Sequence, residues 1–267
     1  ELLKQGDVGT IVATIGNTGL GAVDRLPEIL DLAASYGARV HADAAYGGYF
    51  GLASELGDDA RSAYDALSQV ESIVVDPHKH GLQPYGCGCI LYRDASVGRF
   101  YKHDSPFTYF SSAELHLGEI SLECSRPGAS AVALWATQQL LPLEKGGQLG
   151  KWLDQGLLAA REFWQQLDDS ERYQPLMPPQ LDIVCYSCCA AKASAASEKA
   201  RRVFELAANK ELHLAMIELP AELLSKYQPQ MECDVATVTC LRSVLMKPEH
   251  REWLPRIMEI LEECASA

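Results

Sequence analysis

The sequence predicts an α/β protein with a mostly parallel sheet in its larger first part and a smaller α+β domain after it. Three observations predict this fold. Apolar β-branched runs alternate with helical patterns, as in parallel sheets covered by helices. Two of these runs end in polar residues of catalytic type, where open α/β sheets bind their ligands. A long helical pattern then leads into a second group of strands and helices.

The first part reads as strand, helix, strand, helix and strand. Residues 8–15 form an apolar run that ends in a Gly-Asn-Thr-Gly loop. The helix after it has Asp24 as its expected cap and Pro27 in its first turn, and Gly37 ends it. The remaining elements expected here are strand 39–43, helix 59–67, strand 72–76 and strand 87–92.

The second part begins after an irregular, aromatic-rich stretch at residues 100–123, which we expect to be a long loop. A helix should follow Gly128 and break near Pro142, and residues 148–167 should form a long helix. Beyond it we expect a small-residue loop at 190–196, strands at 182–185, 212–219 and 236–245, and helices at 197–207 and 249–264, the last with Trp253 on its apolar face.

Lys79 and Asp43 are the candidate catalytic pair. A lysine can hold an aldehyde cofactor as a Schiff base, and a carboxylate at a strand end can pair with a protonated ring nitrogen. Such pairing favours the protonated ring by about 1.4–4 kcal/mol. Pyridoxal phosphate needs both groups. Asp76 and Pro77 should form the turn that presents Lys79, and His78 can contact the cofactor phosphate or the substrate carboxylate.

Simpler roles exist for the same residues. Asp43 can be a helix cap or part of a surface turn, and Lys79 can be a solvated surface lysine. Thr14 and Thr18 can bind the cofactor or only satisfy backbone groups of their loop. A cysteine cluster at 185–189 has no second ligand pair, so we predict free thiols and no metal site.

Six segments carry a resemblance to a known family. The chain resembles the pyridoxal-phosphate-dependent group II amino acid decarboxylases, which include the glutamate, aromatic amino acid, tyrosine and aspartate enzymes. The segments are Thr14-Ile15-Gly16-Asn17-Thr18-Gly19, Gly21-Ala22-Val23-Asp24, His41-Ala42-Asp43-Ala44-Ala45-Tyr46-Gly47-Gly48, Asp76-Pro77-His78-Lys79, Ser125-Arg126-Pro127-Gly128 and Leu241-Arg242-Ser243-Val244.

The resemblance implies the fold-type I transferase-like architecture, with residues 1–145 as the carboxy-terminal portion of the large cofactor-binding domain and residues 146–267 as the small domain. It implies a homodimer with active sites at the subunit interface. Ala45 is expected to pack against the cofactor ring, and Tyr109 is a candidate proton donor by position, or part of an aromatic interface. Arg242 and Arg126 are the candidates for binding the substrate carboxylate, although Arg126 can instead hold loops together.

Two departures from the family pattern are visible. Many members have asparagine where this chain has Asp76, and a carboxylate near a phosphate is unfavourable unless it points away. The family's serine- and glycine-rich phosphate loop and its ring-stacking histidine lie upstream of the matched region. Because the chain also begins at Glu1, we expect it to be the later part of a longer polypeptide.

Composition excludes some classes of partner. The formal charge of −13 argues against nucleic acid and anionic membranes. No stretch of about twenty apolar residues predicts a membrane span. The nine cysteines have no secreted disulfide pattern, which favours a reducing cytoplasm.

The resulting prediction is a cytoplasmic, pyridoxal-phosphate-dependent amino acid decarboxylase. Asp43 and Lys79 would serve equally in an aminotransferase or in a carbon–carbon lyase of the sphingosine-phosphate lyase kind. A further alternative is a non-catalytic assembly module without the upstream cofactor cradle.

Overall fold

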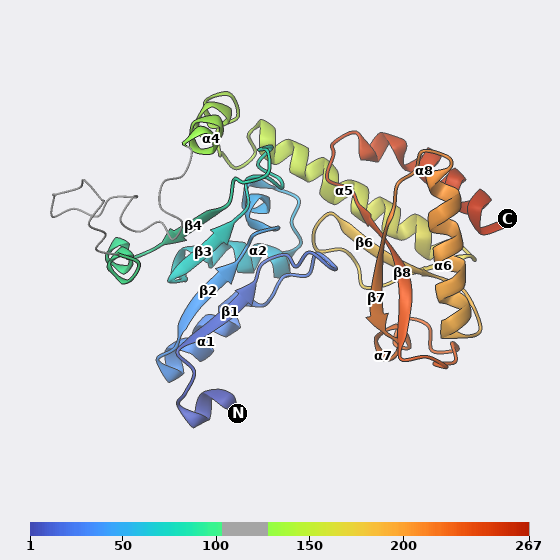
Figure 1. Cartoon of the computed structure of the whole chain (residues 1–267), viewed down its shortest axis with the longest axis horizontal. Coiled ribbons are helices and arrows are strands. Elements are labelled where there is room, and N and C mark those ends of the chain that lie inside the picture. The colour runs from blue at the N-terminus through green and yellow to red at the C-terminus, as the bar shows by residue number, and fades with distance from the viewer. Residues whose placement is uncertain (103–127, 267) are drawn as a thin grey trace. The chain divides into compact units, whose positions relative to one another are not determined.

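The computed structural model describes residues 1–102 and 128–266 (Figure 1). These residues form two compact units, each described by itself. The first unit is made from Glu1–Ile15, Asp24–Tyr49 and Ser62–Pro142, and the second from Gly16–Val23, Phe50–Arg61 and Leu143–Ala267. The predicted division at residue 145 into parts of a large and a small domain stays a prediction.

The first unit is built on a four-stranded sheet in the order β1-β2-β3-β4 (Figure 1). Strands β1 (Thr10–Thr14), β2 (Arg39–Asp43) and β3 (Ser72–Val75) are parallel, and β4 (Cys89–Tyr92) is antiparallel to β3. The predicted α/β class with a mostly parallel sheet is confirmed. The connection from β3 to β4 contains no crossover helix, which fits the reversed last strand.

Helix α1 (Leu26–Tyr36) connects β1 and β2. Pro27 lies in its first turn, and Gly37 ends it with a φ of 67°, as the sequence predicts. The predicted cap is wrong: Arg25 occupies the cap position, and the Asp24 carboxylate accepts the backbone N–H of Thr14 at 2.7 Å. Asp24 therefore holds the end of β1. Among the described residues before 143, the other α-helices are α2 (Asp58–Asp65) and α4 (Ala129–Leu140).

The two faces of this sheet differ. Ala13, Val40 and Ala42 on one face are at most 1% exposed. On the other face Val12 is 58% exposed, and Thr14 and Asp43 are half-buried. The polar residues at the strand ends therefore belong to the more open face.

The second unit has a separate antiparallel sheet in the order β5-β6-β8-β7. Its strands are β5 (Tyr173–Pro175), β6 (Ile183–Cys188), β7 (Ala215–Pro220) and β8 (Thr237–Val244). The sequence did not predict β5, which is three residues long. The strand expected from residue 212 begins later, at Ala215.

Helices α5 (Gln148–Asp168) and α6 (Ala193–Ala208) pack against this sheet, and α8 (His250–Ser266) packs against these two helices. The short α7 (Ala221–Leu224) follows β7. The loop predicted up to residue 196 is wrong because α6 already begins at Ala193. Ala193 and Ala196 are fully buried, and alanine is the best helix former. Trp253 was expected on the apolar face of α8, but it is 60% exposed and Leu254 is buried instead.

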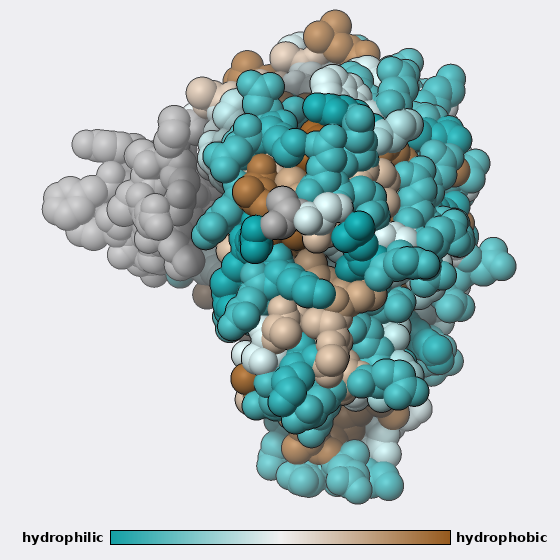
Figure 2. Space-filling view, turned by 90° about the vertical axis from the view of Figure 1, so that its right-hand side faces the viewer, coloured by the Kyte–Doolittle hydropathy of each residue, from teal (hydrophilic) through white to brown (hydrophobic). Residues whose placement is uncertain are grey.

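Aromatic side chains fill the core of the second unit. The ring of Tyr186 makes edge-to-face contacts with Phe163 and with Tyr173, each with 5.6 Å between ring centroids. The Tyr173 hydroxyl donates to the Leu261 carbonyl at 2.6 Å, so its polar end is satisfied. Figure 2 shows that the face of the molecule turned toward its viewer is mostly hydrophilic, with a smaller hydrophobic patch.

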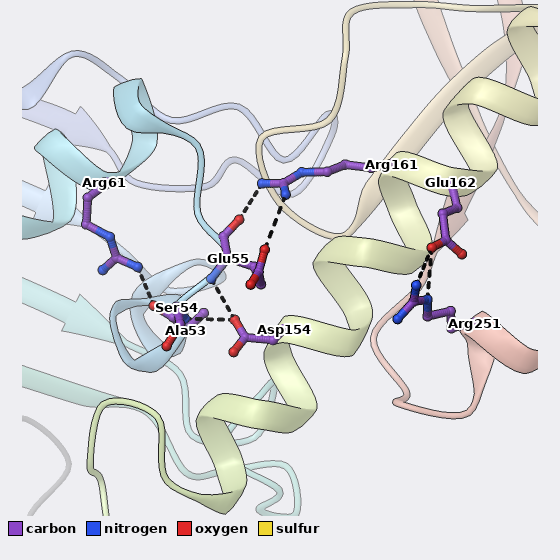
Figure 3. Close-up of polar contacts among 8 residues, drawn as sticks. All are labelled: Ala53, Ser54, Glu55, Arg61, Asp154, Arg161, Glu162 and Arg251. Atoms are coloured by element: carbon purple, nitrogen blue, oxygen red, sulfur yellow. Dashed lines mark hydrogen bonds and ion pairs between the residues drawn. The ribbon is translucent and has the colours of Figure 1, made fainter.

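One face of α5 holds the segment Phe50–Arg61, which belongs to the same unit (Figure 3). Gly150 lies so close to this segment that an added Cβ would be 2.5 Å from the Leu52 carbonyl oxygen. One turn later the Asp154 carboxylate accepts the backbone N–H groups of Ser54 and Glu55 at 2.8 and 2.9 Å. Arg161, two turns further, donates to the Glu55 carbonyl. The segment is therefore fixed through its backbone.

No helix within residues 1–102 and 128–266 is both long enough and apolar enough to cross a membrane. The same ranges contain no group of three or more His, Cys, Asp or Glu residues that could hold a metal ion.

Candidate cofactor site

The carboxyl ends of β1 and β2 bring Thr14 and Asp43 together. The two residues are register partners, and Asp43 pairs in turn with Val74 on β3. Because register partners on neighbouring strands point to the same face, the Thr14 hydroxyl and the Asp43 carboxylate share one face at one edge of the sheet. The Asp43 Oδ1 atom accepts the backbone N–H of Ala45 at 3.2 Å, which turns the chain directly after the strand.

The turn that carries Lys79 lies at the same edge, after β3. The backbone N–H of Asp76 donates to the Ala45 carbonyl at 3.2 Å, which ties this turn to the one after β2. The backbone N–H of Lys79 donates to the Asp76 carbonyl at 2.9 Å and closes the turn. The structure therefore brings Asp43, Ala45, Asp76 and Lys79 into two bonded turns, which the sequence anticipated only as strand ends.

Asp76 makes contacts that the sequence did not predict. Its Oδ2 atom lies 3.1 Å from the Lys79 Nζ atom and 3.6 Å from the His78 Nε2 atom. His78 is also held from behind, because its Nδ1 atom lies 2.9 Å from the Cys87 carbonyl oxygen. The Asp76 carboxylate is therefore directed at the lysine amine and the histidine ring.

Close packing fixes both turns. A Cβ on Gly47 would lie 2.1 Å from the Ile15 carbonyl oxygen, and one on Gly81 would lie 2.7 Å from the Pro77 carbonyl oxygen. The Tyr64 hydroxyl donates to the Gly47 carbonyl at 2.7 Å. Sequence reasoning assigned no role to Gly47 or Gly81. The feature of the sequence that could have identified them is their position. Gly47 lies within five residues of Asp43, and Gly81 lies within five residues of Lys79.

Thr18 and Arg242 belong to the second unit. The Arg242 Nε atom donates to the Gly19 carbonyl at 2.9 Å, and its Nη2 atom donates to the Thr18 carbonyl. Two donors of this predicted carboxylate-binding arginine are therefore bonded to backbone. Two further candidates, Tyr109 and Arg126, lie outside the described residues.

A model of the pyridoxal-dependent decarboxylase conserved domain matches residues 1–189. This chain belongs to the pyridoxal-dependent decarboxylase family. The family predicted from the sequence is thereby confirmed, and the predicted cofactor is that of the family.

Curated relatives agree with the family assignment. The probable L-aspartate decarboxylase of Pyrococcus furiosus is 33% identical over 177 residues, which are 66% of this chain and 46% of the relative. The L-tyrosine decarboxylase of Enterococcus faecalis is 28% identical over 60% of this chain and 31% of its own length. The chain therefore spans less than half the length of these two decarboxylases.

Solved structures of low sequence identity share the fold. Mouse CSAD superposes with a TM-score of 0.75 at 20% identity, over 96% of this chain and 52% of that one. Oryza sativa TDC, solved with PLP, gives a TM-score of 0.70 at 21% identity, over 96% of this chain and 48% of that one. The predicted fold of the pyridoxal-dependent decarboxylases is thereby confirmed.

The groups at the sheet edge fit the cofactor of this decarboxylase family. Pyridoxal phosphate requires an amine for its aldehyde and an acid for its ring nitrogen. The Lys79 side chain is 27% exposed, and Asp43 is half-buried at the same edge. The hydroxyl of Thr14 adds a neutral hydrogen-bonding group beside Asp43.

Proposed function

We propose that the protein carrying this chain decarboxylates an amino acid with pyridoxal phosphate, and that Lys79 and Asp43 are its central residues. The observation that carries the proposal is the convergence of an amine and a carboxylate at the carboxyl edge of one parallel sheet, in two turns tied together by the hydrogen bond from Asp76 to Ala45. Family membership supports the reaction type.

Asp43 and Lys79 have different roles in the proposed reaction. Bound pyridoxal phosphate supplies an electron sink for the charge left when carboxylate departs. Asp43 holds a proton on the ring nitrogen, which sustains that sink. The Lys79 amine would hold the cofactor through its aldehyde and would carry protons at the reacting carbon.

The neighbouring residues orient these groups. Ala45 lies on the turn after Asp43 and offers a small apolar contact for the ring. Asp76 keeps the Lys79 amine within its turn through the 3.1 Å ion pair. His78 binds the cofactor phosphate or the substrate carboxylate, and Thr14 and Thr18 add hydroxyl groups. The substrate carboxylate is the proposed ligand of Arg242 and Arg126, and Tyr109 is the proposed proton donor.

We further propose a homodimer in the cytoplasm. Support for the compartment comes from the cysteines, because the eight in the described residues are all free thiols. Support for the dimer comes from the resemblance stated above.

Reductive trapping tests the central role of Lys79. Borohydride treatment of the cofactor-loaded protein should fix the cofactor's mass on the peptide that contains Lys79. Lys79→Ala should abolish that adduct and the release of carbon dioxide. Lys151→Ala, which removes an exposed lysine from α5, should keep both.

A substrate panel decides the reaction. It should include aspartate and tyrosine, the substrates in the names of the two curated relatives. Release of carbon dioxide with formation of the amine supports a decarboxylase. Transfer of the amino group would indicate an aminotransferase, and release of an aldehyde would indicate a carbon–carbon lyase. An adduct on another lysine would refute the proposed site.

A further inference from the structure

The loop Gly16–Val23, which follows β1, is packed on the sheet of the second unit, to which it belongs. Its glycines allow a close approach. A Cβ on Gly19 would lie 3.4 Å from the Ile217 side chain on β7, and one on Gly21 would lie 3.3 Å from Cβ of Ile183 on β6. Gly21 also has a φ of +70°, which favours glycine. The loop therefore packs closely against two strands, β6 and β7.

Polar contacts hold the same loop. The Gly19 carbonyl accepts from the Arg242 Nε atom at 2.9 Å and from the Cys185 thiol at 3.5 Å. Arg242 also donates to the Thr18 carbonyl through Nη2. The backbone N–H of Val23, at the other end of the loop, donates to the Gln180 side chain at 2.8 Å. Within the described part of the chain, Arg242 is therefore the one residue whose side chain donates hydrogen bonds to two carbonyls of this loop.

The position of Arg242 makes it a firm anchor. It lies on β8, which is paired on one side with β6 and on the other with β7, at Cys185 and Ala215. Because β8 is a central strand, the backbone of Arg242 is held in place on both sides. The guanidinium binds planar acceptors through pairs of N–H groups, and the Nε–Nη2 pair is used here on the two carbonyls. Only the Nη1–Nη2 end remains for another ligand.

We propose that Arg242 is a positioning residue that clamps the Gly16–Val23 loop and thereby fixes Thr18. The inference rests on the proposed function in one respect, since Thr18 is a candidate contact of the cofactor. The substrate carboxylate proposed as a ligand of Arg242 then binds at the Nη1–Nη2 end of the guanidinium. One arginine thus orders the loop before any ligand arrives.

Hydrogen exchange of the loop tests the clamp without any cofactor. The loop has internal amide hydrogen bonds from Gly16 and Asn17 to the Ala22 carbonyl and from Gly21 to the Asn17 carbonyl. Arg242→Ala removes two charge-assisted bonds, so these amides should exchange on the order of tenfold to a hundredfold faster. Arg242→Lys should give an intermediate increase, because an ammonium lacks the planar fork.

Two controls separate the clamp from general destabilisation. Arg251→Ala removes an arginine of the same unit that pairs with Glu162 on α5 (Figure 3), and it should leave loop exchange unchanged. Gly21→Ala keeps Arg242 but pushes the loop from its seat, so it should also accelerate loop exchange. Exchange of α5 amides should stay the same in every variant. Unchanged loop exchange in Arg242→Lys and Gly21→Ala would overturn the proposal, and these two variants decide it if Arg242→Ala does not fold.

Cofactor titration followed by absorbance adds a readout that distinguishes the clamp from a pure carboxylate ligand. If Arg242 acts through the loop, Arg242→Lys and Gly21→Ala both raise the apparent dissociation constant of the cofactor severalfold. A pure carboxylate ligand would instead raise only KM for the amino acid, and only in Arg242→Lys, which would count against the clamp. A protein that binds no cofactor would refute the proposed function, while the exchange result would still decide the clamp.

Discussion

The two sheets of the molecule use their side chains differently. Every residue of β6 in the second sheet is buried, whereas no residue of β3 in the first sheet is fully buried. The second sheet packs large rings such as Tyr173 and Tyr186 against its helices, and the first buries alanines such as Ala42. The candidate cofactor site lies on the first sheet. The contrast suggests that residues for stability and residues for chemistry are largely separate in this chain.

The largest effect should follow from Phe163→Ala in the core of the second unit. Phe163 is fully buried and contacts the ring of Tyr186, so its removal should lower the free energy of unfolding by about 3–5 kcal/mol. Denaturant unfolding measures the loss. Trp253→Ala on α8 is the matched control, because its side chain is 60% exposed and its removal should cost below about 0.5 kcal/mol. Similar losses in the two variants would contradict the assignment of the core.

There is a physical reason why the sequence predicts the edge of the sheet at which the candidate site residues lie. Hydrophobic runs with turn residues predict strands, and the carboxyl ends of parallel strands lie at one edge of a sheet. Asp43 and Lys79 could therefore be expected at the same edge of the sheet from the sequence alone. The alternation of strands and helices likewise gave the parallel part of the sheet. The direction of β4 is not encoded in such a pattern, because strands of both directions have the same periodicity.

Contacts between distant residues could not be predicted. Asp24 has the residue type of a helix cap, but its carboxylate binds Thr14, ten residues back. The contact of Arg242 with Gly19 joins residues 223 positions apart, and no local pattern reports it. A run of small residues hid the start of α6 at Ala193, since such runs occur in loops and in tightly packed helices alike. The family resemblance supplied the chemistry of these residues but not their partners.

A smaller effect is expected from Asp154→Ala on α5. The carboxylate is 9% exposed and accepts two backbone N–H groups of Phe50–Arg61, which would lose their acceptor (Figure 3). We expect a loss of about 2 kcal/mol in unfolding free energy and faster exchange of the Ser54 and Glu55 amides. Asp154→Asn keeps an acceptor oxygen but not the charge, so its loss in unfolding free energy should be about half as large. Asp168→Ala, an exposed change on the same helix, should change neither quantity measurably, and equal behaviour of the two alanine variants would reject the anchor.

The smallest effect concerns pH and tests whether acid acts on the second unit. Burial lowers the pKa of His250 at the start of α8, and its Nδ1 atom accepts the Lys247 backbone N–H at 3.3 Å. Since the pKa is lower in the folded than in the unfolded state, the unfolded state binds more protons as pH falls through about 6.5. Stability should therefore decrease from above that pH down to the folded pKa, and then level off.

His250→Gln should remove this part of the pH dependence, because glutamine can accept the same N–H without titrating. The difference between wild type and variant is measured as the free energy of unfolding between about pH 5 and pH 8, the range in which histidine titrates. His213→Gln replaces an exposed histidine of the same unit and serves as the control. If the wild type and His250→Gln lose stability in parallel as pH falls, His250 does not make the second unit acid-sensitive. If only His250→Gln loses less unfolding free energy than the wild type as pH falls, protonation of this half-buried ring destabilises the second unit. That effect would be separate from the sheet edge of the first unit, which carries Lys79.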